Sequence, residues 1–68
     1  MPRLPRLTAQ EAEDLLLQAG FELIRTGGSH RIYLRQGRRV VVPFHGHRIL
    51  HPKVVTQVVA AIAAIRPT

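Results

Sequence analysis

The stretch SHRIYLRQGRRVVVP, residues 29–43, decides the fold of this chain. Both of its ends are rich in residues that favour β-strands, and a glycine-containing triplet stands between them. The pattern predicts a β-hairpin with strands over 29–34 and 38–42, closed by a turn at 35–37. Pro43 is expected to end the second of these strands, because proline has no backbone N–H to donate to a neighbouring strand.

The residues before the hairpin predict an arm, a helix and a strand. Residues 1–7 contain two prolines and are expected to be extended. Thr8 and Glu11 have the spacing of a capping box, and apolar residues then recur at helical spacing up to Gly20, which predicts a helix over 9–19. The acids of its first turns are expected to cap the helix and to be solvated. A strand over 21–25 and a glycine turn over 26–28 complete this part.

The residues after the hairpin predict an irregular connection over 44–51 and a second helix over 53–65. The whole chain, 1–68, is therefore expected to be one α+β domain of order α-β-β-β-α, with a three-stranded antiparallel sheet and two helices on one face. Because side chains alternate along a strand, His30, Ile32 and Leu34 should share one face. Ser29, Arg31, Tyr33 and Arg35 should share the other.

Charge points to a polyanionic partner. Ten Lys and Arg stand against four Asp and Glu, which gives a net charge of +6, and no acid follows Glu22. Nucleic acid is the expected partner, and an acidic protein comes second. The absence of cysteine excludes a disulfide framework and a zinc finger and fits a cytoplasmic protein. No apolar run is long enough to span a membrane, and the N-terminal residues do not resemble a secretory signal.

A candidate catalytic site gathers around His30. Its imidazole changes protonation near neutral pH and can act as general base or general acid on a phosphate ester. The glycines before it let backbone N–H groups approach an anion. The residues expected to bind RNA are Gly28, Ser29, Arg25, Arg31, Arg38, Arg39, His45 and Lys53.

Other interpretations of these side chains stay open. His30 can be a half-buried structural residue, because most histidines are not catalytic. The three histidines within 45–51 form a loose cluster with no cysteine or carboxylate nearby, so we expect neither a metal nor another cofactor there. Tyr33 and Phe44 are candidates for stacking on bases, although core packing is favoured for Phe44.

Four short motifs stand in a fixed order along the chain. They are LPRLT at 4–8, AGF at 19–21, GSH at 28–30 and VVVPFH at 40–45. In this order and at this chain length they resemble the HicA toxins of bacterial and archaeal toxin–antitoxin pairs, which are small ribonucleases that cleave mRNA. The third motif contains the histidine that is catalytic in that family, so the resemblance implies that His30 is catalytic.

The resemblance also implies a fold like that of double-stranded-RNA-binding domains, mRNA as substrate, and a HicB-type antitoxin that covers the histidine. The chain differs from the family at 53–55, where Lys-Val-Val replaces the usual Gly-Thr pair. The predicted function is the toxin of such a pair, acting as a metal-independent endoribonuclease. Two alternatives stay open, a non-catalytic RNA-binding module of the same fold and a protein-interaction domain whose charge serves an acidic partner.

Overall fold

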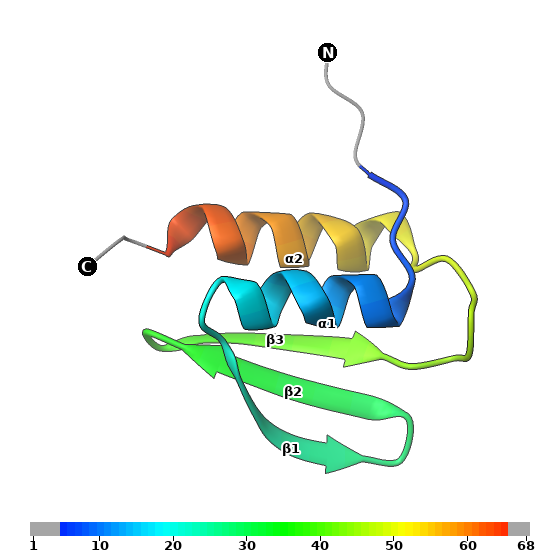
Figure 1. The fold of residues 1–68 in the computed structure, drawn as a ribbon, viewed down its shortest axis with the longest axis horizontal. Helices are drawn as coiled ribbons and strands as arrows, with labels where there is room; N and C mark the ends of the chain where they lie inside the picture. Colours follow the sequence, from blue (N-terminus) through cyan, green and yellow to red (C-terminus); the bar gives the residue numbers. More distant parts are fainter. Residues whose placement is uncertain (1–4, 66–68) are drawn as a thin grey trace.

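The computed structural model describes residues 5–65. Its elements follow the order α1 (Ala9–Gln18), β1 (Glu22–Gly27), β2 (His30–Arg35), β3 (Arg38–Pro43) and α2 (Pro52–Ala64). The strands form one antiparallel sheet in the order β1-β2-β3. The two helices lie side by side and pack against β3, whereas β1 forms the edge farthest from them (Figure 1). The predicted α+β class and element order are confirmed, and residues 1–4 of the predicted arm lie outside the described residues.

Helix α1 begins and ends close to the predicted positions. The Thr8 hydroxyl accepts from the Glu11 backbone N–H at 3.2 Å, and the Glu11 carboxylate accepts from the Thr8 N–H at 2.9 Å, so the predicted capping box is present. The helix ends at Gln18, with Ala19 as its C-cap. Its buried stripe then places α1 over the sheet.

Gly20 turns the chain from α1 toward β1 in a left-handed backbone conformation that residues with a side chain disfavour. Its φ is 90°, and the guanidinium of Arg35 occupies the place where a Cβ would stand. We expect Gly20→Ala to lower the free energy of unfolding by about 1 kcal/mol or more. Gly27→Ala is the matched control, because nothing lies within 4 Å of a Cβ there. Urea denaturation of both variants tests this, and equal loss at the two positions would contradict it.

The first hairpin differs from the prediction by two residues. Thr26 and Gly27 pair with Arg31 and His30, so they belong to β1, and the predicted turn over 26–28 is wrong. The turn consists of Gly28 and Ser29 alone, and Gly28 has the positive φ, 57°, that a two-residue hairpin loop of this kind requires at its first position. The register of the β1–β2 pairing shifts between residues 23 and 25, as at a β-bulge.

The alternation predicted for β2 is confirmed, but the face with the aliphatic residues turns away from the helices. Tyr33 is fully buried under the helices, whereas Leu34 is 37% exposed and Ile32 is half-buried. We call the uncovered side of the sheet the open face. The residues on it, read from the strand register, are Glu22, Arg25, Gly27, His30, Ile32, Leu34, Arg39, Val41 and Pro43.

The core lies between the helices, β3 and the middle of β2. It consists of Leu7, Ala9, Ala12, Leu16, Phe21, Tyr33, Val40, Val42, Leu50, Val55, Val58 and Ala61. The connection over 44–51 is irregular, as predicted, and is held at its far end by a backbone hydrogen bond of 2.7 Å from Leu50 to Leu7. Within residues 5–65, neither helix is long and apolar enough to cross a membrane.

Candidate functional site

His30 is the first residue of β2 and is exposed to solvent. It pairs with Gly27 on one side and with Pro43 on the other, immediately after the Gly28-Ser29 turn. The interpretation of this histidine as a half-buried structural residue is therefore wrong. The strand backbone fixes its Cα, and its ring is free to meet a ligand on the open face.

A second imidazole stands beside the first. The ring centroids of His30 and His45 are 6.4 Å apart, and the ring planes lie at 84° to each other. The backbone explains this placement, because the Phe44 N–H donates to the Ser29 carbonyl at 2.6 Å and extends the β2–β3 pairing by one residue. Side-chain alternation past Pro43 then directs His45 to the same side as His30.

Arg25 is the predicted arginine that shares the open face with His30 at the same end of the sheet. It stands opposite Ile32, which is two residues along β2 from His30. Diagonal neighbours of this kind have Cα atoms about 7–8 Å apart, which a long side chain can span. The turn residues Gly28 and Ser29 lie beside the two histidines, and Lys53 lies in the first turn of α2.

The structure does not bring Arg38 and Arg39 to this site. They pair with Arg35 and Leu34, at the opposite end of β2 from His30. Five residues of strand separate the two ends by roughly 16 Å. A phosphate held by the two histidines is therefore out of reach of these arginines, so any RNA contact they make involves another part of the strand.

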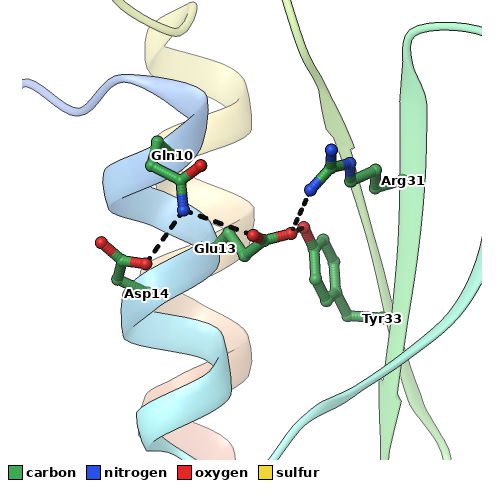
Figure 2. A network of polar contacts seen from close by, with 5 residues as sticks. All are labelled: Gln10, Glu13, Asp14, Arg31 and Tyr33. Carbon is green, nitrogen blue, oxygen red and sulfur yellow. Dashed lines mark hydrogen bonds and ion pairs between the residues drawn. The ribbon is translucent and has the colours of Figure 1, made fainter.

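Arg31 faces the helices and is held by a carboxylate. Its Nη1 donates to Glu13 Oε2 at 2.8 Å, and the Tyr33 hydroxyl donates to the same oxygen (Figure 2). Gln10 donates to the other oxygen at 3.3 Å and to Asp14 at 3.0 Å. The carboxylate of Glu13 thus joins α1 to β2.

Two predictions about these residues are wrong. Glu13 is 8% exposed and bonded to the sheet, so it is not a solvated capping residue. Tyr33 is fully buried, so it cannot stack on a base. The sequence does contain a signal for Glu13, because its spacing from Ala9, Ala12 and Leu16 places it on the buried stripe of α1. A charge on such a stripe requires partners from elsewhere in the fold.

The network sets the protonation of its members. Burial by itself raises the pKa of the Glu13 carboxyl, but the hydrogen bonds from Tyr33 and Arg31 outweigh it, so the pKa lies below the ordinary 4.5. Burial and the hydrogen bond to Glu13 raise the pKa of the Tyr33 hydroxyl well above its usual range. The hydrogen bond to Glu13 also raises the pKa of the Arg31 guanidinium. At neutral pH the carboxylate is therefore charged and both donors keep their protons.

Arg31 also links this network to the histidine pair. Its guanidinium carbon lies 4.1 Å from the centre of the Phe44 ring, in a cation–π contact. Phe44 packs against the core, as favoured from the sequence, and precedes His45 directly. Glu13 therefore holds Arg31, and Arg31 supports the segment that places His45 beside His30.

The histidines do not form a metal site in the part of the chain that the structure describes. No group of three or more His, Cys, Asp or Glu side chains comes together there in a way that could hold an ion. What the arrangement offers is a pair of exposed imidazoles with an arginine on the same face. Such a pair can bind an anion and move protons on it.

The chain is a small α+β domain of order α-β-β-β-α, with a basic composition and an exposed pair of histidines. This arrangement is compatible with the architecture of double-stranded-RNA-binding domains. A family model described as the HicA toxin of bacterial toxin–antitoxin systems matches residues 9–64. The chain therefore belongs to the HicA toxin family, which identifies it as a toxin component and implies an antitoxin partner. No curated protein matches the chain.

Proposed function

We propose that this toxin is a metal-independent endoribonuclease that cleaves mRNA in the cytoplasm, with His30 and His45 as its acid–base pair, and that a HicB-type antitoxin is its protein partner. The observation that carries the proposal is the placement of two exposed imidazoles 6.4 Å apart at the end of the sheet. Both rings can reach the oxygens of one phosphodiester. The resemblance to ribonucleases of the HicA family supports the same assignment.

In the proposed reaction one imidazole takes the proton of a ribose 2′-OH. The 2′-oxygen bonds to phosphorus, the bond from phosphorus to the 5′-oxygen breaks, and the other imidazole gives its proton to that leaving oxygen. The products are a 2′,3′-cyclic phosphate and a 5′-OH. A single histidine does not easily do both tasks in one in-line step, whereas a neutral and a protonated histidine together do. Each contributes roughly 10²–10⁴ in rate.

Charge on the phosphate needs a separate partner. Arg25 shares the open face with the histidines and can donate two hydrogen bonds to phosphate oxygens. Arg31 is already bonded to Glu13 and faces the helices, so its contribution to the reaction is to support the loop. Lys53 and the Gly28-Ser29 turn contribute to RNA binding around the cleaved bond.

The reaction is tested with purified protein and an end-labelled RNA in the presence of EDTA. We expect cleavage that the chelator does not affect, products that end in a 2′,3′-cyclic phosphate, and no cleavage where the ribose before the bond is replaced by deoxyribose. The deoxyribose substrate is the control for chemistry through the 2′-OH.

Two outcomes would contradict the proposal. Cleavage that stops in chelator would mean that a metal ion supplies the chemistry. A gel shift that weakens with salt, without any cleavage, would favour the non-catalytic RNA-binding module instead.

A further inference from the structure

A pocket opens beside His45, where the end of β3 meets the start of α2. Its volume is about 330 Å³. In Figure 1 the loop that joins these two elements lies at the same end of the molecule as the β1–β2 turn. Among its lining residues, the apolar Pro43, Leu50 and Val54 are buried or half-buried, and we call them the floor. His45, Arg48 and His51 are exposed, and we call them the rim.

The rim offers hydrogen-bond donors and no acid. The Nδ1 of His51 accepts from the Lys53 backbone N–H at 3.0 Å, because His51 is the N-cap of α2. In the neutral ring the proton is therefore on Nε2, which is left as a donor. Arg48 adds a guanidinium, whose planar fork suits phosphate oxygens. No acidic residue lines the pocket.

The apolar floor of the pocket is held in place by contacts within the fold itself. Leu50 is 7% exposed and its N–H is bonded to the Leu7 carbonyl at 2.7 Å, and a β-bridge joins Thr8 to Ile49 beside it. Val54 belongs to α2 and packs against the core. An apolar floor with a few polar groups at its rim, in a pocket of at least about 300 Å³, is typical of small-ligand sites.

We propose that this pocket binds the RNA nucleotide next to the cleaved phosphate, with its base or ribose over the floor and its outer phosphate on Arg48 and His51. The inference rests on the proposed ribonuclease function, because His45 belongs both to the rim and to the histidine pair. A strand whose scissile phosphate lies between His30 and His45 enters the pocket one nucleotide further along. If the pocket is occupied in this way, the KM of the enzyme depends on how far the RNA extends on one side of the cleaved bond.

The test uses oligonucleotides that contain one ribonucleotide in a 2′-O-methyl strand, so that a single bond can be cut. The strand is lengthened by one nucleotide and its phosphate on either side of that bond. We expect KM to fall about tenfold on one side only, since a hydrogen-bonded phosphate is worth at least about 1.4 kcal/mol. In Arg48→Ala and His51→Asn this decrease in KM on lengthening the strand should disappear, while kcat on the short substrate stays within twofold of its original value.

The variants are chosen to keep the fold. Asparagine is a good N-cap, so His51→Asn retains the start of α2 while it removes the Nε2 donor. Arg6→Ala also removes one positive charge, but Arg6 does not line the pocket. This variant should therefore still show the decrease in KM when the strand is lengthened. If Arg48→Ala and His51→Asn still show the decrease in KM, as Arg6→Ala does, the pocket is not a nucleotide site.

A binding measurement separates this inference from the proposed function. A fully 2′-O-methylated oligonucleotide cannot be cleaved, and we expect it to shift the methyl signals of Leu50 and Val54 in NMR spectra of the labelled protein. Shifts without any RNA cleavage in the separate assay would support the pocket and overturn the ribonuclease. Cleavage without shifts would leave the ribonuclease standing and overturn the pocket.

Discussion

His30→Ala is expected to abolish RNA cleavage while leaving the protein folded. His30 is exposed and its described contact is the edge-on approach of the His45 ring, so its removal should change the free energy of unfolding by less than about 0.5 kcal/mol. Loss of one member of an acid–base pair should slow the chemical step by roughly 10²–10⁴. Single-turnover cleavage of a labelled RNA measures the rate, and thermal unfolding measures the stability.

The partner histidine supplies the matched comparison. His45→Ala should slow cleavage in the same range, and each single variant should lose one limb of the bell-shaped pH dependence that an acid–base pair produces. The double variant should be little slower than either single one, because the two rings act as a unit. In cells, His30→Ala should also relieve growth arrest. A rate in His30→Ala equal to that of the unaltered protein would remove this histidine from the mechanism.

The order of the elements was predictable because each has a local signal. The capping box and Gly20 mark α1, and the strand-rich halves of 29–43 mark the second hairpin. The end of β1 was not predictable in this way. The sequence Thr26-Gly27-Gly28 has turn composition, but the pairing of the first two with β2 is decided by the register of the whole hairpin.

The sequence also does not predict which face of the sheet is buried by the helices. Alternation separates Ile32 and Leu34 from Arg31 and Tyr33, and the aliphatic pair looks like the buried one. The helices cover the other pair instead, because Tyr33 fills the core and Glu13 satisfies the polar ends of both Arg31 and Tyr33. That choice depends on a residue 18 positions away from Arg31, which no local pattern contains.

The candidate site was predictable in its central residue and not in its surroundings. His30 follows from its place between a glycine turn and a strand. The nearness of His45 depends on the continued pairing at Phe44, and the pocket beside it depends on the bond between Leu7 and Leu50. The loop over 44–51 has no repeating pattern, so its course is set by such tertiary contacts.

Glu13→Ala is expected to destabilise the protein more than the loss of either exposed acid of α1, Glu11 or Asp14. It removes the acceptor of both Tyr33 and Arg31 and leaves the buried tyrosine hydroxyl unpaired, at a cost of about 1–3 kcal/mol. A domain of this size is stable by only about 3–10 kcal/mol, so the loss is a large fraction of the total. Asp14→Asn is the control, because Asp14 is exposed and bonds only to Gln10 among the contacts described. Urea denaturation at neutral pH compares them.

The pH dependence of stability identifies the charge on Glu13 as the cause. Its pKa in the folded protein lies below the ordinary 4.5, so its contribution is present above pH 4.5 and is lost as the pH falls through the lower folded value. Glu13→Gln keeps the size and an acceptor oxygen but cannot titrate. Its free energy of unfolding should therefore fall less between pH 6 and about pH 3 than that of the unaltered protein or of Asp14→Asn, since both of these retain the Glu13 carboxylate and its ion pair with Arg31. Equal acid sensitivity in Glu13→Gln and Asp14→Asn would show that the ion pair with Arg31 does not stabilise the fold.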